Sequence, residues 1–393
     1  MLALNYEFPP LGGGAGNATL NICRELDALG QEVAVLTSHF QGLPRRERIG
    51  GVEVHRVRVL RRRLDRSSPL EMGSFVLAAA LPAASLARRL RPDVLHVYFG
   101  IPTGPVGLFV HLLTGVPYLL SLRGGDVPGF LKDELAWVHR LTGPLTRAVW
   151  GQAAAVVANS QGLGALAQRS LPGRPVHVIP NGVDTRRFRP APEHANPGPG
   201  VFRILSAGRL VEQKGVRYVI EALPQVAAAG RRVEFAIVGS GPSEESLRRL
   251  AQEVGVAGQV CFLGWLDREE LAARYRASDA FVLPSFEEGM PNVVLEAMAS
   301  GLPIVTTDIY GNRELVRDGE QGFLVPPGDA AAVGAALARL AADPDLARSL
   351  GRQARQRAEG FSWGKVAQAY LDLSEKALAA PPAGAAHRSV LPE

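Results

Sequence analysis

Short apolar strand patterns alternate with longer helical patterns along the whole chain of 393 residues. This alternation is typical of parallel α/β architecture. The chain is long enough for two domains of ordinary size, and the strand patterns fall into two groups, so we expect two sheets. The first group is Leu2–Tyr6, Val33–Thr37, Val94–Val97, Tyr118–Ser121, Ala155–Ala158 and Val176–Ile179, and the second is Ile204–Ala207, Val233–Val238, Val260–Phe262, Ala280–Leu283 and Ile304–Thr306.

A segment rich in proline and glycine separates the two groups of strands. Residues 181–200, NGVDTRRFRPAPEHANPGPG, hold four prolines and three glycines without periodicity, which indicates a linker. Two doubly wound domains joined here would face each other across a cleft at the carboxyl ends of both sheets, where ligands bind in such folds. We predict a first domain over 1–185, a linker over 186–200, a second domain over 201–360, an amphipathic helix over 361–378 and a disordered tail over 379–393.

Composition narrows the class of protein. The chain is 47% hydrophobic and 21% charged, as in soluble globular proteins. Cys23 and Cys261 form no C-x-x-C pair, which suits a reducing cytosol and excludes a disulfide framework. The first residues lack the basic and apolar regions of a signal peptide, and the apolar run 75–87 is interrupted by Pro82 and too short to span a bilayer. We therefore expect a cytoplasmic protein.

Positive charge is concentrated in the first half of the chain. Residues 44–66 hold nine arginines against the three acids Glu47, Glu53 and Asp65. These arginines either lie on solvated strand and loop faces or form a surface that meets anionic lipid, or an anionic acceptor, at the inner face of the membrane. No aromatic side chains are interleaved with them to stack on bases, so we do not expect nucleic acid as a partner.

The most informative stretch is PSFEEGMPNVVLEAMASGLPIV, residues 284–305. Gly289 and Pro291 exclude regular helix between Glu288 and Glu296, and proline suits the first position of a helix. We therefore place Glu288 on a loop just before a helix and Glu296 on the second turn of that helix. A helix start attracts phosphate, and a carboxylate accepts hydrogen bonds from sugar hydroxyls. The spacing of the two acids alone is weak evidence, because one solvated glutamate together with one capping glutamate gives the same spacing more often than a sugar site does.

A second group of charges lies in SAGRLVEQKG, residues 206–215. Arg209 and Lys214 follow a predicted strand, at the mouth of its sheet. Arginine binds a diphosphate through two hydrogen bonds and lysine binds it as a point charge. Taken alone, the pair is equally typical of two surface cations in a strand-to-helix loop.

Two glycine-rich turns also follow predicted strands, FPPLGGGAGN at 8–17 and VGSGP at 238–242. Glycine lets the backbone approach a ligand closely and present amides to an anion. Neither turn completes G-x-G-x-x-G, because Asn17 and Glu244 stand where the third glycine belongs. A dinucleotide-dependent dehydrogenase is therefore poorly supported.

With these motifs the chain, from Asn5 to about Leu373, resembles glycosyltransferase family 4, retaining enzymes of GT-B fold that use nucleotide-sugar donors. The resemblance implies an α/β protein of two doubly wound Rossmann-like domains facing across a cleft, with the C-terminal helix packing back on the first domain. It also implies that the N-G-V-D motif, residues 181–184, shapes the hinge.

The same resemblance implies roles for individual residues. Glu296 would hold the donor ribose and Glu288 would contact the transferred sugar. Arg209 and Lys214 would clamp the diphosphate. The remaining candidates are glycines and main-chain groups that would face the sugar, the phosphates or the base: Gly13, Gly14, Gly264, Gly289, Met290, Asn292 and Val293. Trp265 is a weaker candidate beside the base and equally typical of core packing.

One departure from the family concerns YLLSLRGGDVPG, residues 118–129. Many relatives have a histidine where this chain has Arg123, so the role of that histidine cannot be transferred. Arg123 stays charged at any relevant pH and would aid the phosphate or an acidic acceptor. Asp126 does match and would accept a hydrogen bond from a sugar hydroxyl. A structural ion pair between Arg123 and Asp126 is the alternative.

The resemblance therefore predicts a retaining glycosyltransferase of hexosyltransferase type, in glycan or cell-envelope biosynthesis, that moves a sugar from a nucleotide-diphosphate donor to a hydroxyl acceptor. The alternatives are a sugar-nucleotide epimerase or phosphorylase on the same fold, and a non-catalytic sugar-nucleotide-binding partner. No cofactor and no metal are expected. The one D-x-D, Asp343-Pro344-Asp345, is interpreted as a helix cap, because Pro344 suits a first helical position. The sugar, base, acceptor and oligomeric state are left open.

Overall fold

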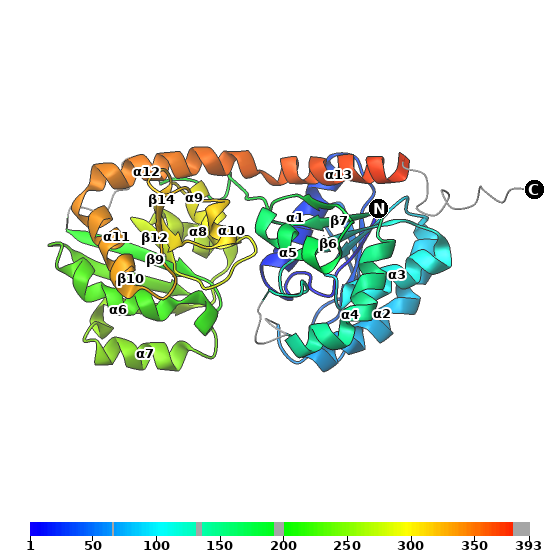
Figure 1. Cartoon of the computed structure of the whole chain (residues 1–393), viewed down its shortest axis with the longest axis horizontal. Coiled ribbons are helices and arrows are strands. Elements are labelled where there is room, and N and C mark those ends of the chain that lie inside the picture. Colours follow the sequence, from blue (N-terminus) through cyan, green and yellow to red (C-terminus); the bar gives the residue numbers. More distant parts are fainter. Residues whose placement is uncertain (65–66, 131–135, 192–199, 380–393) are drawn as a thin grey trace, which may run out of the picture. The chain divides into compact units, whose positions relative to one another are not determined.

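The computed structural model describes residues 1–64, 67–130, 136–191 and 200–379. It divides the chain into two compact units (Figure 1). The first comprises Met1–Asn181 together with the chain from Trp363 onward, and the second comprises Gly182–Ser362. Each unit is a largely parallel sheet with helices on both faces, as the alternation of strand and helix patterns predicted.

The sheet of the first unit has the strand order β3-β4-β2-β1-β5-β6-β7-β8. All neighbours pair in parallel except β3, which pairs antiparallel with β4 at the edge. The direction of winding reverses between β1 and β5. The strands are β1 Leu2–Leu4, β2 Ala34–Ser38, β3 Arg46–Ile49, β4 Val52–Val57, β5 Leu95–Tyr98, β6 Tyr118–Leu122, β7 Ala155–Ala158 and β8 Val176–Val178.

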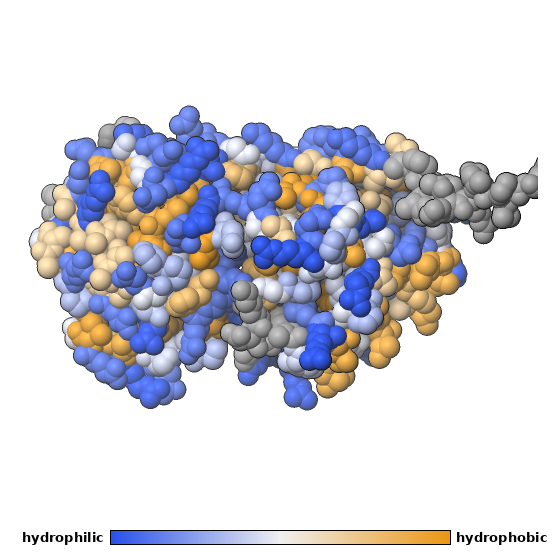
Figure 2. All heavy atoms as spheres, in the orientation of Figure 1, coloured by the Kyte–Doolittle hydropathy of each residue, from blue (hydrophilic) through white to orange (hydrophobic). Residues whose placement is uncertain are grey.

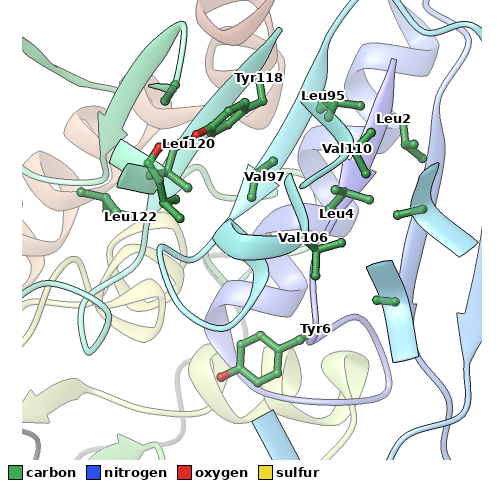
Figure 3. Close-up of a cluster of buried hydrophobic side chains, with 14 of the residues drawn as sticks. Leu2, Leu4, Tyr6, Leu95, Val97, Val106, Val110, Tyr118, Leu120 and Leu122 are labelled. Carbon is green, nitrogen blue, oxygen red and sulfur yellow. Dashed lines mark hydrogen bonds between the residues drawn. The ribbon is translucent and has the colours of Figure 1, made fainter. Parts of the chain in front are cut away.

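Two apolar layers flank this sheet, because successive strand residues point to opposite faces. Leu4, Val97 and Leu120 pack on one side with the helices α2 Pro69–Leu90, α3 Thr103–Thr114, α4 Ala136–Gln152 and α5 Gln161–Ser170 (Figure 3). Ala3 and Leu119 face the other side, which α1 Gly14–Ala28 and α13 Trp363–Ala379 cover.

The strands β3 and β4 were not predicted, because arginines obscure their alternation. Val52 and Val54 are buried while the residues between and before them are partly exposed. Arg56 is also buried: its guanidinium pairs with Glu47 and donates to the carbonyls of Pro44 and Pro9 (both 3.2 Å). An arginine whose charge is paired and whose two terminal nitrogens donate in this way can occupy an inward position of a strand, although the Arg56 Nε–H has no hydrogen-bond partner among the described residues.

The sheet of the second unit is parallel throughout, in the order β11-β10-β9-β12-β13-β14. The strands are β9 Val201–Ala207, β10 Arg232–Val238, β11 Val260–Gly264, β12 Ala280–Leu283, β13 Ile304–Thr307 and β14 Gly322–Val325, of which β14 was not predicted. One face packs against α6 Val216–Ala227, α7 Glu244–Glu253 and α11 Ala330–Ala342. The other packs against α8 Arg268–Arg276 and α9 Asn292–Ala299, and α12 Pro344–Ala358 lies on α9.

The predicted domain boundary and linker differ from the structure. Residues 182–191 belong to the second unit, where Phe188 is fully buried. The Arg355 Nη1 donates to the carbonyls of Thr185 (3.1 Å) and Phe188 (2.9 Å), and the Val183 N–H donates to the carbonyl of Phe361 (2.7 Å). These contacts fix a segment whose prolines indicated a free linker. Residues 192–199 of the predicted linker, and the tail 380–393, lie outside the described residues.

Helix α13 belongs to the first unit through its buried side. Tyr370 is fully buried, its hydroxyl lies 2.9 Å from the Ser121 Oγ, and its ring packs on His96. The His96 Nε2 lies 3.0 Å from the Ser374 Oγ, and burial lowers the pKa of His96 to about 3. His96 is therefore a neutral packing residue between the sheet and α13.

We predict that Tyr370→Ala destabilises the first unit by about 3–5 kcal/mol, because it leaves a cavity under α13. Tyr370→Phe keeps the ring and loses only the hydroxyl contacts, so about 1 kcal/mol is expected. Urea denaturation followed by circular dichroism compares the two variants with the wild type. Equal stability of Tyr370→Ala and the wild type would show that α13 does not depend on this contact.

Candidate functional site

The centre of the second sheet brings together two loops that are far apart in the sequence. β9 pairs in parallel with β12, although β10 and β11 lie between them along the chain. The direction of winding reverses at this pair, and residues 208–215 and 284–291 leave the sheet side by side at its carboxyl end. Such a switch point is where open parallel sheets bind ligands.

Hydrogen bonds join the two loops directly. The Phe286 N–H donates to the Gln213 carbonyl (2.8 Å), and the Gln213 Nε2 donates to the Glu287 carbonyl (2.7 Å). The Lys214 Nζ donates to the Glu288 Oε1 at 2.6 Å. The predicted cation loop and the predicted acid loop therefore form one site.

Glycines allow the backbones to approach this closely. Gly215 has φ +66°, and a Cβ on it would lie 2.1 Å from the Pro284 carbonyl oxygen. Gly239 has φ +124°, and a Cβ on it would lie 1.9 Å from the Gly208 carbonyl oxygen. A side chain at either position would push the loops apart, so these glycines serve the close packing of three neighbouring loops.

Of the two predicted cations at this edge of the sheet, one is paired with an acid within the part of the chain that the structure describes and the other is not. Arg209 is exposed, and no ion pair of it is found among the described residues. Lys214 is paired with Glu288, which also accepts from the Ser285 Oγ (2.7 Å). Both of these bonds fall on the Oε1 of Glu288. Because Lys214 uses one of its three ammonium N–H donors on this oxygen, two donors are left for another acceptor.

Helix α9 starts one residue later than predicted. Pro291 is the N-cap, with φ −77° and ψ 110°, and Asn292 is the first helical residue. Proline fits here because its missing N–H would have no partner inside the helix. Gly289 and Met290 precede the helix and Val293 lies in its first turn. The structure thus places all these predicted residues around the start of α9.

Glu296 lies on the second turn of α9, as predicted, and is almost buried. Its Oε2 accepts from the Tyr275 hydroxyl (3.3 Å), and its Oε1 lies 3.6 Å from the Arg268 Nη2. Burial raises the pKa of Glu296 to about 7, while Arg268, Tyr275 and the more distant Arg187 oppose this shift. The carboxyl group is poised between its two protonation states near neutral pH.

Arg268 is a site residue that the sequence prediction missed. It is the first residue of α8, and its Cζ lies 5.6 Å from the centre of the Phe188 ring. The sequence does carry a signal for the start of α8, because Asp267 and Glu270 form a capping box just beyond β11. What the sequence does not show is that α8 packs beside α9 and so brings Arg268 to Glu296.

The carboxyl end of β11 holds the residues predicted to lie beside a base. Gly264 has φ +67°, and its carbonyl accepts from the Gly239 N–H (2.7 Å). Trp265 is 77% exposed, so the interpretation as a core-packing residue is wrong. A role of Gly264 in base binding stays a prediction.

The remaining predicted site residues lie in the first unit. Gly13 caps α1 and Gly14 is its first residue, so both follow β1 at the point where the winding of the first sheet reverses. A Cβ on Gly13 would meet nothing within 4 Å, so the backbone there is open to an approaching group.

Arg123 and Asp126 lie on the loop after β6 and have partners within the unit. The Arg123 guanidinium donates to the Asn181 Oδ1 (2.9 Å) and the Tyr370 hydroxyl (3.4 Å) and stacks on the Tyr98 ring. The buried Asp126 carboxylate accepts from the backbone N–H groups of Gly100, Arg123 and Gly124. Burial raises the pKa of Asp126, and these hydrogen bonds oppose the rise. The alternative of a side-chain ion pair between Arg123 and Asp126 is wrong.

The D-x-D motif is a helix cap, as predicted. The Asp343 side chain accepts from the Leu346 N–H (2.9 Å), and Pro344 is the first residue of α12. Within the described residues, no group of three or more histidine, cysteine and acidic side chains is arranged to hold a metal ion.

Comparisons with protein families match both halves of the chain. Residues 13–182 match the glycosyl transferase 4-like domain, and residues 192–357 match the glycosyl transferases group 1. The glycogen synthase of Mycobacterium tuberculosis is 30% identical over 94% of this chain and 92% of its own length. The 2-deoxystreptamine glucosyltransferase of Streptomyces kanamyceticus is 28% identical over 83% of this chain and 89% of its own length.

Solved structures of similar fold cover nearly all of the chain. The sucrose-phosphate synthase of Thermosynechococcus elongatus superposes with a TM-score of 0.81 at 25% identity, over 97% of this chain and 99% of its own. HepE of Anabaena, in complex with UDP and glucose, superposes with a TM-score of 0.75 at 20% identity, over 95% of this chain and 99% of its own.

We predict that Glu296→Gln changes how the stability of the second unit depends on pH. The raised pKa means that the folded state prefers the neutral acid, so its stabilisation is present below the ordinary carboxyl pKa and is lost as the pH rises through about 7. Relative to the glutamine variant, the wild type should lose about 2–3 kcal/mol of unfolding free energy between pH 5 and pH 8.

Urea denaturation of both proteins at the two pH values measures this difference. Glu245→Gln, on the exposed side of α7, is the matched control for the loss of one carboxylate. Parallel pH profiles of the wild type and Glu296→Gln would contradict the raised pKa of Glu296.

Proposed function

The chain belongs to the group 1 glycosyltransferases of GT-B fold, and we propose that it moves a sugar from a nucleotide-diphosphate donor to a hydroxyl acceptor with retention of the anomeric configuration. The observation that carries this proposal is the convergence of Arg209, Lys214, Glu288 and the start of α9 at the switch point between β9 and β12. Cations and a helix start meet the phosphates there, and carboxylates meet the sugars beside them.

The diphosphate is the part of the donor that these cations suit. Arg209 offers an exposed guanidinium, and Lys214 keeps donors beyond its bond to Glu288. Two positive groups with the positive end of the α9 dipole favour the charge that grows on a departing diphosphate. HepE, which shares the fold, was solved with UDP and glucose, in keeping with a nucleotide-sugar donor.

The two carboxylates suit the sugar hydroxyls. The Oε1 of Glu288 accepts from Lys214 and Ser285, and its Oε2 has no hydrogen-bond partner among the described residues. We assign Oε2 to a hydroxyl of the transferred sugar. We assign Glu296 to the donor ribose, since an ionised carboxylate accepts from two hydroxyls at once. Arg268 then acts as a positioning residue that favours the ionised form.

In the proposed reaction the leaving phosphate itself takes the proton of the acceptor hydroxyl, which attacks the anomeric carbon from the face that the phosphate leaves. The glycosidic bond forms, the bond to the phosphate breaks, and the configuration is kept. The protein contributes position and electrostatic stabilisation rather than a nucleophile. No metal is required in this scheme, because the cationic side chains and the α9 start balance the diphosphate.

The first unit would bind the acceptor. Gly13 presents an open backbone just before the start of α1, Gly14 is the first residue of that helix, and Arg123 adds a guanidinium after β6. Asp126 is reassigned from a sugar-binding group to a positioning residue, because three backbone N–H groups already bind its carboxylate. It keeps the loop of Arg123 in shape.

We further propose a cytoplasmic protein that contacts anionic membrane through this unit. Of the predicted arginines, Arg56 and Arg61 are used internally. The described arginines of the region that stay exposed are Arg45, Arg46, Arg48, Arg58, Arg62 and Arg63.

We predict that Lys214→Ala and Arg209→Ala each lower kcat by at least about a hundredfold, because each removes a positioned donor from the leaving diphosphate. Single-turnover kinetics with the preferred donor measure the effect. Arg352→Ala, an exposed arginine on α12, is the matched control. Near-normal turnover of both site variants, with the fold intact, would remove the diphosphate clamp.

We also predict that an α-configured donor gives an α-linked product, which proton NMR of the anomeric signal reports. An inverted product would overturn the retaining mechanism. The donor incubated without acceptor should stay unchanged apart from slow hydrolysis. An isomerised sugar nucleotide would instead indicate an epimerase.

A further inference from the structure

Helix α2 of the first unit turns a row of leucines to solvent. Leu70, Leu77 and Leu81 are 74%, 83% and 72% exposed, and their spacing places them on one side of the helix. The opposite side, with Phe75 and Ala79, is buried in the core. An amphipathic helix of a globular protein normally shows polar residues on its outer side, so this row is unusual.

Helix α4 repeats the pattern. Trp137, Leu141 and Leu145 follow each other at four-residue steps and are 62%, 75% and 42% exposed. Its inner side, with Val149 and Trp150, packs in the same core layer as Phe75 of α2. We name these six residues of α2 and α4 the apolar face.

Helix α3 lies between the two and extends this surface, because it packs against both α2 and α4. Leu112 at its end is 70% exposed. Figure 2 shows orange residues at the lower right of the molecule, where Figure 1 draws α2 and α3. Contiguous exposed apolar patches rimmed by polar residues mark contacts with proteins, membranes or ligands.

The length and composition of α2 point to a membrane as its partner. Among the described residues, α2 is the one helix that is long and apolar enough to cross a membrane by length and composition. The sequence predicted that the apolar run is interrupted at Pro82 and is too short to span a bilayer. The structure corrects this length, because the helix continues through Pro82 to Leu90. Its inner side is occupied by the core of the unit, so α2 can lie on a bilayer but not cross one.

The charges around the apolar face are almost all positive. The described parts of α2, α3 and α4 carry four arginines and one acid, Glu71. That acid accepts from the backbone N–H groups of Ser68 (2.7 Å) and Arg62 (2.8 Å). It therefore caps α2 and also holds the backbone of Arg62 beside the start of the helix. The four arginines are Arg88, Arg89, Arg140 and Arg147. The acids Asp65, Asp133 and Glu134 lie outside the described residues.

We propose that the apolar face docks on the surface of an anionic lipid bilayer. Its leucines and Trp137 would enter the boundary between headgroups and acyl chains, and the arginines would meet lipid phosphates. A second copy of this chain is a poorer partner, because a symmetric pair would set arginines against arginines. The docking assigns a particular face to the membrane contact that the proposed function gives to the first unit. A lipid-linked acceptor is its consequence if the proposed transferase activity holds.

Flotation with vesicles tests the docking. Wild-type protein should float with vesicles of phosphatidylglycerol and phosphatidylcholine, and far less with phosphatidylcholine alone. Leu77→Glu and Leu141→Glu should each weaken binding by at least about tenfold, since each places a charge where an apolar side chain enters the membrane. Leu378→Glu, an exposed leucine of α13, is the matched control and should bind as the wild type does. Arg140→Gln with Arg147→Gln should lower binding to the anionic vesicles only.

Thermal melting of each variant separates lost docking from lost folding. Wild type that stays unbound to the anionic vesicles, or apolar-face variants that float as well as the wild type, would overturn the proposal. So would a wild-type dimer in sedimentation that the same variants dissociate, which would make the face a contact between copies. Transfer to a soluble acceptor reports the proposed function separately, because the apolar-face variants should retain it.

Discussion

The parallel pairing of β9 with β12 is the contact on which the site of the second unit depends. It joins strands that are separated along the chain by β10 and β11, and so places a loop with two cations beside a loop with an acid and a helix start. Gly215 lets the loops approach, and the Lys214–Glu288 pair holds them together. Charge of both signs is thus fixed in place before any ligand arrives, which is what electrostatic catalysis of group transfer requires.

The pair of Glu296 and Arg268 is a second electrostatic feature of this site. Glu296 is buried enough that its pKa rises to about 7, and Arg268 at 3.6 Å acts in the opposite direction. A carboxyl group accepts from two sugar hydroxyls, one on each oxygen, most strongly when it is ionised, so the cation of α8 complements the acid of α9. The site therefore depends on three layers of structure: strand order, loop contacts and the packing of two helices.

Local patterns predicted the strands and the motifs well, because periodicity, glycine and proline act over a few residues. Asp343 as a cap and Glu296 on the second turn of its helix are examples. Contacts between distant segments could not be predicted. Nothing local indicates that Arg268 meets Glu296, or that the guanidinium of Arg123 binds Asn181 and Tyr370. The strands of the arginine-rich region and the anchoring of the predicted linker were missed for the same reason, since the buried Arg56 and the half-buried Arg355 donate to carbonyls far along the chain.

The most direct measurement is a crystal structure with the nucleotide-diphosphate sugar that raises the melting temperature most in a thermal-shift screen. We expect density for the diphosphate within hydrogen-bond distance of Arg209 and Lys214, at the start of α9, with the ribose on Glu296 and the transferred sugar on Glu288. Density at any other edge of the second sheet, or a diphosphate out of reach of both cations, would contradict it.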